Sequence, residues 1–315
     1  MCKTIRITLA GLLAAALLLP LLLCACTAAE TEHDPDKLSI VCTDFPAYDF
    51  ARAIAGDRAE ILLLIKPGAE SHSFEPTPKE ILSIESCDLF ICNGGESEAW
   101  AERLYRDGGI ERRLVMMDCV ETVTEEEKEG MYVRGEEDEE ELDEHVWTSP
   151  VNAAAIVSAI CDELCKLSPD DATYFRANCD AYRARLAELD SEFRRTVANA
   201  KHDVLVFADR FPMRYFTLEY GLDYFAAFPG CSGETEPSAK TVAFLIDKVR
   251  DEKLPAVLYM EFSNQKMADV ICEETGCKKL PFYSVHNVTA EQLEAGLGYL
   301  DLMEINLKSL KEALG

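Results

Sequence analysis

The chain has five histidines, and three of them stand in segments whose neighbours would hold an imidazole in place. These segments are PGAESHSFEPTP, which contains His72, DEHVWTSP, which contains His145, and YSVHNVT, which contains His286. Neutral imidazole is a ligand suited to zinc, manganese or iron, so three converging imidazoles would form a transition-metal site. Taken singly, each could instead be a hydrogen-bonded structural histidine. The other two, His33 and His202, lie in polar surroundings typical of a solvated surface.

A carboxylate commonly completes a four-coordinate metal site, and Asp209 is the nearest candidate. It lies in FADRFP (207–212), after an apolar stretch, where it could equally cap a helix or pair with Arg210. Glu234 and Glu236, in CSGETEP (231–237), are alternative carboxylates, although acids at a helix start also stabilise the helix that follows. Three histidines with one carboxylate favour zinc, whereas a second carboxylate would shift the preference toward manganese.

Two similar halves of alternating strands and helices would carry these residues. In the first half, apolar runs predict strands at 38–42, 61–65, 89–92 and 114–117, and amphipathic stretches predict helices at 48–55, 79–86 and 96–105. In the second half, strands are predicted at 204–207, 224–228, 256–260 and 279–282, and helices at 215–220, 239–251, 265–274 and 290–314. This alternation predicts an α/β fold of two lobes, each with a parallel-rich sheet flanked by helices. Ligands bind at the carboxyl ends of such strands, and the segments with His72 and His286 each follow a predicted strand.

A long helix is predicted between the halves, from residue 170 to about residue 198. Apolar side chains recur there at helical spacing, and Pro169 with the two aspartates after it suits the N-terminus. Such a helix would be about 40 Å long and would join the lobes rigidly, unless it is a surface helix of one domain. The predicted divisions are an N-terminal lobe over 38–169, the linking helix over 170–200 and a C-terminal lobe over 201–315.

The first residues predict export from the cytoplasm. Lys3 and Arg6 precede a nearly unbroken apolar run that ends in LCAC, the pattern of a signal peptide over 1–25. The run of about 17 apolar residues is marginal for a membrane span. Leu-x-Ala-Cys resembles the lipobox of bacterial lipoproteins, so Cys26 is the expected lipidation site, with a tether over 26–37. We therefore expect an extracytoplasmic protein held to the outer face of the cell membrane by lipid alone.

The formal net charge of −27 opposes binding to nucleic acid or to an anionic membrane surface and suits a cationic ligand. The segment 121–144 alone has thirteen acidic residues, which predicts a mobile surface loop that either collects cations or is simply solvated. When Cys2, Cys24 and Cys26 are set aside, ten of the thirteen cysteines remain. This even number could form disulfides, but the spacing does not determine their connectivity.

Several motifs resemble the solute-binding components of zinc and manganese ABC importers. They are HSFEPTP (72–78), CDL (87–89), NGG (93–95), EAW (98–100) and EHVWTSP (144–150), together with a closing helix over 299–314. The resemblance extends over nearly the whole chain from Leu38. The chain departs from the family pattern at ADRFPMRY (208–215), where His or Glu is usual, and before His145, where an acidic run replaces a histidine-rich loop.

The resemblance implies two lobes joined by a rigid helix, with one metal ion held between them for delivery to an ABC permease. His72 and His145 carry over directly, Asp209 is matched to the third ligand, and His286 is matched to the fourth after a small shift. Zn²⁺ is the expected ion, Mn²⁺ the alternative, and the protein is expected to be a monomer that binds without catalysis. Two rival hypotheses are a manganese- or iron-binding homologue with an adhesin role and an extracellular metallohydrolase. The sequence has no HExxH motif to favour the hydrolase.

Overall fold

The computed structural model describes residues 34–70, 73–131, 141–230 and 237–315. Residues Asp36–Gly315 form one compact unit. Several predictions lie outside the described residues: the signal peptide, Cys26, His72, Glu234, Glu236 and residues 132–140 of the acidic segment. No helix in the described ranges combines the length and the hydropathy that a membrane crossing requires.

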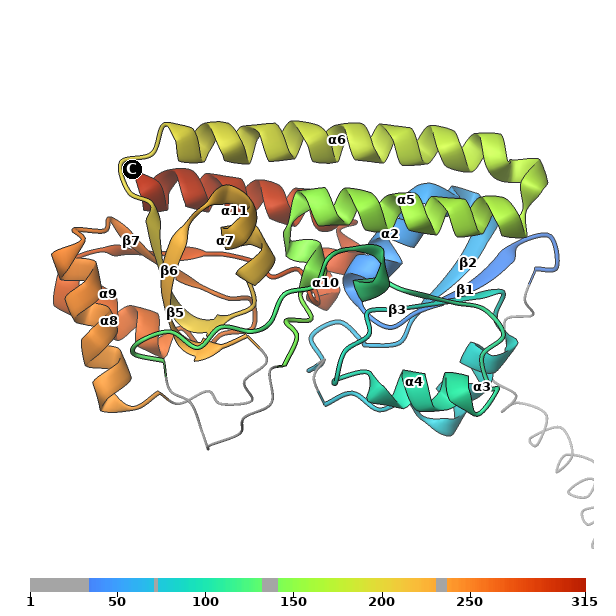
Figure 1. Cartoon of the computed structure of the whole chain (residues 1–315), viewed down its shortest axis with the longest axis horizontal. Coiled ribbons are helices and arrows are strands. Elements are labelled where there is room, and N and C mark those ends of the chain that lie inside the picture. Colours follow the sequence, from blue (N-terminus) through green and yellow to red (C-terminus); the bar gives the residue numbers. More distant parts are fainter. Residues whose placement is uncertain (1–33, 71–72, 132–140, 231–236) are drawn as a thin grey trace, which may run out of the picture. The chain divides into compact units, whose positions relative to one another are not determined.

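The first lobe is built on a parallel sheet with the strand order β2-β1-β3-β4 (Figure 1). Its elements are β1 (Leu38–Cys42), α2 (Phe45–Ala55), β2 (Ala59–Leu63), α3 (Pro78–Ser86), β3 (Leu89–Cys92), α4 (Ala99–Arg106) and β4 (Arg113–Val115). Successive side chains of a strand point to opposite faces of the sheet. Ile40 and Ile91 accordingly join the core on the α2 side, whereas Val41 and Phe90 pack with Trp100 of α4 on the other side.

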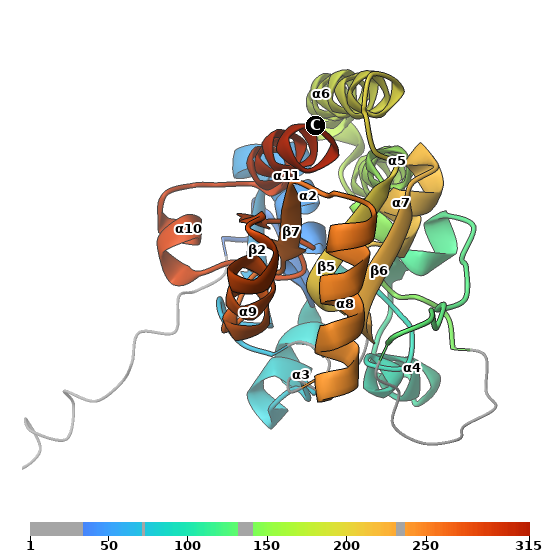
Figure 2. The same cartoon turned by 90° about the vertical axis from the view of Figure 1, so that its left-hand side faces the viewer.

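The second lobe repeats this plan with the strand order β6-β5-β7-β8. Its elements are β5 (Val204–Phe211), α7 (Arg214–Tyr220), β6 (Asp223–Pro229), α8 (Ala239–Asp251), β7 (Ala256–Tyr259), α9 (Lys266–Thr275) and β8 (Lys278–Pro281). Figure 2 shows α8 and α9 on one side of this sheet and α11 (Tyr299–Leu314) on the other. Leu205 and Phe207 face the α11 side, whereas Val206 and Ala208 face α8 and α9. All pairs of neighbouring strands in both sheets are parallel, which confirms the predicted fold class.

Helix α6 (Ala172–Ala198) crosses both lobes, as Figure 1 shows. It packs on α2 and α5 (Pro150–Leu167) of the first lobe and on α7 and α11 of the second. Its apolar residues Phe175, Leu186 and Phe193 belong to one hydrophobic core that also contains residues of both sheets. Short 3-10 turns complete the fold, namely η2 (Gly56–Arg58), η3 (Met117–Cys119), η4 (Val146–Thr148) and η5 (Pro169–Asp171). Because the lobes share a core, a large swing of one lobe against the other would expose apolar surface.

The prediction of one continuous helix over 290–314 is wrong. The segment forms α10 (Ala290–Glu294) and α11, and the chain turns between them at Gly296, whose φ is 75°. Asp301 accepts a hydrogen bond from the Gly298 amide (2.8 Å) and so caps the new helix start. Periodicity alone missed the break because a glycine with positive φ interrupts a helix without disturbing the apolar pattern.

Strand β5 is longer than predicted and irregular near its end. Phe207 pairs with Ala226 of β6, but Arg210 pairs with Phe228, so β5 has one extra residue between these two pairs. An extra residue of this kind is a β-bulge, which changes the direction in which the following side chains point. The bulge lies beside Asp209, the predicted carboxylate ligand.

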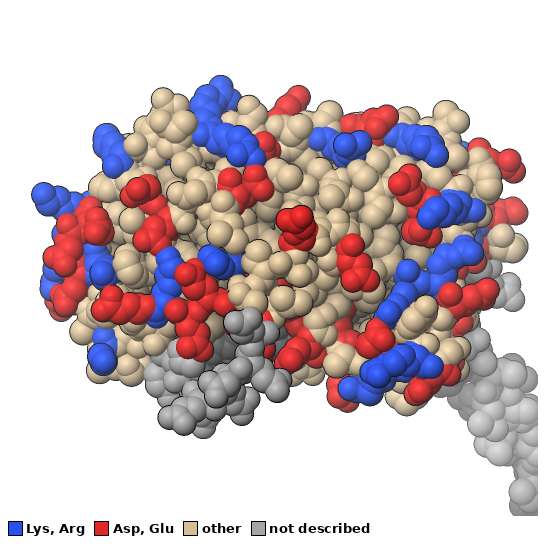
Figure 3. Space-filling model, in the orientation of Figure 1, with Lys and Arg blue, Asp and Glu red and all other residues tan. Residues whose placement is uncertain are grey.

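The acidic segment lies partly within the described residues, and these parts contact the second lobe. Glu126 pairs with Arg214 of α7 (2.8 Å) and accepts a hydrogen bond from the Tyr224 hydroxyl (3.2 Å). Lys128 pairs with Asp223 at the start of β6. On the face in Figure 3, acidic side chains are scattered over both lobes among basic ones. The predicted mobility of the segment stays a prediction.

Candidate metal centre

A cavity of about 160 Å³ lies where the carboxyl ends of the two sheets face each other. The first lobe contributes Gly68, Ala69 and Glu70 from the loop after β2, together with His145. The second lobe contributes residues from the ends of all four strands. They are Arg210 and Pro212 at the end of β5, Gly230 after β6, Met260, Glu261 and Phe262 after β7, and Ser284, His286 and Asn287 after β8. This is the position at which parallel α/β sheets bind ligands.

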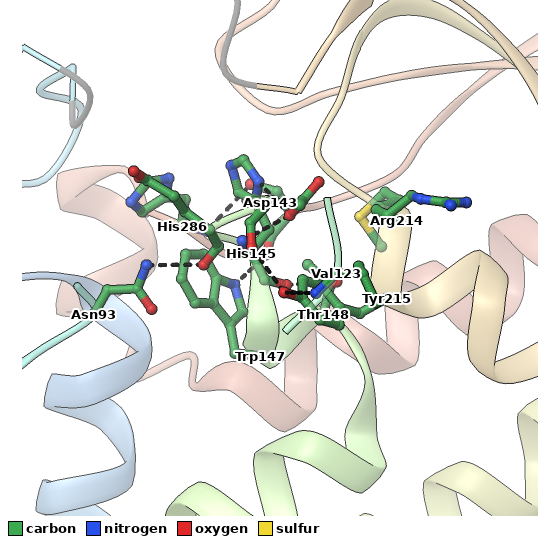
Figure 4. A network of polar contacts seen from close by, with 12 residues as sticks. Asn93, Val123, Asp143, His145, Trp147, Thr148, Arg214, Tyr215 and His286 are labelled. Atoms are coloured by element: carbon green, nitrogen blue, oxygen red, sulfur yellow. Dashed lines mark hydrogen bonds and ion pairs between the residues drawn. The ribbon is translucent and has the colours of Figure 1, made fainter. Parts of the chain in front are cut away.

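Two of the predicted histidines meet in this cavity. The rings of His145 and His286 have centroids 5.6 Å apart and are nearly perpendicular, at 86°. Both rings lie against Trp147, as Figure 4 shows. A ring centroid lies about 3 Å from a zinc ion bound at its nitrogen, so two imidazoles on one tetrahedral ion stand about 5 Å apart. The observed separation therefore suits a shared ion.

Asp143 orients the imidazole of His145. Its Oδ1 accepts a hydrogen bond from the His145 amide (2.8 Å) and lies 3.1 Å from Nδ1 of the ring. When Nδ1 carries the proton, Nε2 is the nitrogen that can bind a metal. The backbone of Asp143 is held in turn, because the Tyr215 hydroxyl donates to its carbonyl (2.8 Å). Both side chains are buried, at 1% exposure for His145 and 2% for Asp143.

The pKa of His145 lies above its usual value of 6.5. Burial is the largest influence and by itself lowers this pKa, but the Asp143 carboxylate opposes it through both charge and hydrogen bond. Glu144 and Glu125 raise the pKa further. The surrounding carboxylates therefore favour a positive charge at this position, whether a proton or a metal ion supplies it.

Glu261 and Trp147 hold the loop that carries His286. Glu261 accepts hydrogen bonds from the Ser284 amide (2.7 Å) and from the Ser284 hydroxyl, and Trp147 donates to the Ser284 carbonyl (2.8 Å). The Ser284 hydroxyl also accepts from the amide of His286 (3.2 Å). Val285 between them has a φ of 64°, which is strained for a β-branched residue and persists only where surrounding contacts enforce it. Burial raises the pKa of Glu261 above its usual value.

The loop that leads to His72 is attached to the same place. Asn287 donates hydrogen bonds to the carbonyls of Lys66 and Ala69, both at 2.9 Å. The amide of Gly68 donates to the carbonyl of Val288 (2.8 Å). His72 itself is outside the described residues, two positions after Glu70, so its role as a ligand stays a prediction.

Asp209 is directed toward the backbone. Its Oδ1 accepts from the Arg210 amide (2.9 Å) and its Oδ2 from the Met260 amide (3.4 Å), and it is not among the residues that line the cavity. Arg210 lines the cavity, and its guanidinium pairs with Glu70 of the first lobe (3.9 Å). The role of Asp209 as a ligand stays a prediction.

Three residues of the site were not predicted from the sequence, namely Glu70 and Glu261, which line the cavity, and Asp143, which contacts His145. Glu261 directly follows the predicted strand 256–260, and Asp143 precedes His145 by two positions, so strand ends and Asp-x-His spacing were available signals. Among the described residues, no group of three His, Cys, Asp or Glu side chains has the geometry to hold a metal ion. The described part of the site is therefore a pair of imidazoles within a polar cavity.

Two buried carboxyl groups lie in the first lobe after β1 and near the start of α4. Burial raises the pKa of Asp44 to about 7 and that of Glu98 to about 8. Asp44 caps α2 by accepting from the Ala47 amide (3.0 Å), and Glu98 accepts from the Gly94 amide (2.7 Å). The negative charge of Asp44 also raises the pKa of Glu98.

The comparisons with known proteins agree with this architecture. The family model ZnuA, described as "Zinc-uptake complex component A periplasmic", matches residues 40–313. The chain belongs to this family.

Two relatives and two solved structures illustrate the similarity. The chain is 32% identical over 303 residues to "High-affinity zinc uptake system protein ZnuA" of Bacillus subtilis, covering 93% of this chain and 94% of that protein. It is 33% identical to "Zinc-binding lipoprotein AdcA" of Streptococcus pneumoniae, covering 98% of this chain but 61% of AdcA. The crystal structure of the Zn(II)-bound ZnuA-like domain of that AdcA superposes with a TM-score of 0.74 at 31% identity, over 88% of this chain and 99% of the domain. The metal-dependent lipoprotein YcdH of Bacillus subtilis gives a TM-score of 0.76 at 30% identity, over 89% of this chain and all of that one (100%).

Proposed function

We propose that this chain is an extracytoplasmic solute-binding protein that captures Zn²⁺ in the cavity between its lobes and delivers it to an ABC importer. The main supporting observation is that the rings of His145 and His286, which come from opposite lobes, lie at a distance suited to one shared ion. Family membership and the zinc named for the relatives support the choice of ion. Binding rather than catalysis is the proposed activity.

The proposed ligand set is His145, His286 and His72, with one carboxylate. His72 is supported by its loop, which is hydrogen-bonded to Asn287 beside His286 and contributes Glu70 to the cavity. Asp209 was the predicted carboxylate, but both of its oxygens accept hydrogen bonds from backbone amides and it does not line the cavity. Glu70 and Glu261 line the cavity, so their carboxylates are also candidates. Glu234 and Glu236 remain further candidates.

Delivery would rest on movement of loops rather than of whole lobes. The shared core through α6 opposes a wide opening. The loop segments around the cavity are joined across the lobes by a few polar contacts, including the pair of Arg210 and Glu70. We propose that docking on the permease loosens these contacts, that the protein acts as a monomer, and that lipid on Cys26 holds it to the membrane.

Zinc titration against a competing chelator tests this proposal. The full-length mature protein should bind one ion, and His72→Ala, His145→Ala and His286→Ala should each weaken binding by more than about 100-fold, beyond the ~10–100-fold effect of outer-shell groups. His202→Ala is the matched control, since His202 lies between α6 and β5 and does not line the cavity. Anomalous scattering at the zinc edge would locate the ion. Equal loss in the control variant, or retained affinity in His145→Ala, would refute the proposed site.

A further inference from the structure

Two cysteines meet at the end of α9. The Sγ atoms of Cys272, in the last turns of the helix, and Cys277, just before β8, are 3.5 Å apart. Between them Gly276 has a φ of 77°, and its amide donates to the carbonyl of Cys272 (2.8 Å). This left-handed glycine cap returns the chain along the last helical turn, which places the residue after the glycine beside the residue four positions before the glycine.

The backbone on both sides of this turn is fixed. The Cys277 amide donates to the Thr275 hydroxyl (3.3 Å), and the Lys278 amide donates to the carbonyl of Pro255 ahead of β7 (3.0 Å). A disulfide has an S–S distance of about 2.05 Å, so the two sulfurs, now 3.5 Å apart, need to approach by about 1.5 Å. Both side chains are half-buried, so an oxidant can reach them.

We propose that Cys272 and Cys277 form an intramolecular disulfide in the exported protein. The proposal rests on the extracytoplasmic location given above, because disulfides persist in oxidising compartments. The oxidant is a disulfide-bearing thiol oxidase. The Cys277 thiolate attacks one sulfur of that disulfide and releases the other as a thiol, and the Cys272 sulfur then attacks Cys277. The second step forms the protein disulfide, frees the second oxidase thiol, and leaves the oxidase reduced by two electrons.

Burial, together with the neighbouring Cys277, raises the pKa of Cys272 above its usual value. Binding of Cys277 to the oxidase removes the contribution of that neighbour. The disulfide would link α9 to the residue just before the edge strand β8. Strand β8 leads directly into the loop that carries His286.

A second group of thiols shows why the position of oxidation has to be mapped. Cys161 and Cys165 of α5 and Cys179 of α6 are buried where these helices pack together. A count of free thiols in the whole protein would not separate this group from the pair at α9. The sequence offers a direct separation, because trypsin releases Met267–Lys278 as one peptide with both proposed partners and no other cysteine.

The test is peptide mapping of the exported protein, alkylated under denaturing conditions without reductant. Met267–Lys278 should carry no alkyl group and should be lighter than its reduced form by the mass of two hydrogen atoms. Hydrolysis of the peptide bond after Glu274 should increase the mass of the peptide by one water molecule, while the disulfide keeps the two fragments together. Two alkyl groups on this peptide would refute the proposal and would leave a cap contact between two thiols. A zinc titration of the same sample reports separately on the proposed function.

A thermal melt of the apo protein gives a second readout. The phosphine reductant TCEP should lower the melting temperature of the wild type by roughly 5 °C, the effect expected for a short disulfide loop in a domain of this size. The double variant Cys272→Ser/Cys277→Ser should melt near the reduced wild type and should lack this part of the response to TCEP. An identical response in both proteins would refute the proposal.

Discussion

Asp143→Asn is the substitution that best tests how the site is organised. Asp143 does not line the cavity, yet its carboxylate contacts both the amide and Nδ1 of His145. Asparagine retains one oxygen to accept from the amide, so the local fold should survive. The variant loses the negative charge that orients the ring and makes its free nitrogen a stronger donor to a metal.

The expected effect is a loss of zinc affinity of roughly 10- to 100-fold at pH 8, the range found when outer-shell carboxylates of metal-bound histidines are removed. This loss corresponds to about 1.4–2.7 kcal/mol of binding free energy. The pKa of His145 should fall at the same time, because burial, which lowers it, remains while the Asp143 charge that raises it is gone. Protons then compete less strongly with zinc in the variant than in the wild type. The difference in affinity between the two proteins should therefore narrow at pH 6.

Chelator competition at pH 8 and pH 6, with an NMR titration of the His145 ring in the apo protein, measures both effects. Asp251→Asn is the control, because it makes the same charge change at an exposed position at the end of α8. Equal zinc affinity of Asp143→Asn and wild type at pH 8 would refute the outer-shell role of Asp143. A loss that is the same at both pH values would show that the pKa argument is wrong.

Three further predictions follow from the same structure. When the pH is lowered, the zinc affinity of the wild type should start to fall before pH 6.5 is reached, because zinc binds the neutral ring and the pKa of His145 is raised. A midpoint below pH 6.5 in a plot of zinc affinity against pH would contradict this prediction. Glu261→Gln should weaken zinc binding by roughly 10-fold, because the glutamine side chain has only one oxygen to replace the two that accept hydrogen bonds from Ser284. Unchanged zinc affinity of this variant in chelator competition would contradict the prediction. Burial raises the pKa of Glu98 to about 8, so the folded state binds the proton of this carboxyl group more tightly than the unfolded state does. Between pH 4.5 and pH 8 the free energy of unfolding of the wild type, relative to that of Glu98→Gln, should therefore fall by up to about 5 kcal/mol. The prediction would be wrong if the unfolding free energies of the two proteins, measured in urea, changed with pH in parallel.

The sequence predicted the architecture because local patterns encode it. Alternating apolar strands and amphipathic helices indicated two parallel sheets, and the helix expected over 170–198 is α6 with its preceding turn. Prolines and a capping box mark the start of α3, where Thr77 and Glu80 bond to each other's amides. Such signals depend on neighbours in the chain, so they are legible without tertiary structure.

The predicted site was partly accessible by the same means. The meeting of His145 and His286 follows from their places next to segments that start or end regular elements. Trp147 entered the prediction only as part of the motif EHVWTSP (144–150), whereas in the structure it supports both rings and donates a hydrogen bond to the loop of His286. Contacts of this type join residues more than a hundred positions apart, and no local pattern records them.

Residue types and spacing by themselves predicted two α/β halves and a transition-metal site with histidine ligands, and the family resemblance placed that site between the lobes. Only the tertiary structure decided which side chains face the cavity. The bulge in β5 adds one residue before Arg210, and in this arrangement Arg210 lines the cavity while Asp209 accepts a hydrogen bond from the amide of Met260, directly after β7. A single inserted residue reverses the direction of the side chains after it, and its presence depends on the pairing with β6, which the sequence of β5 does not contain.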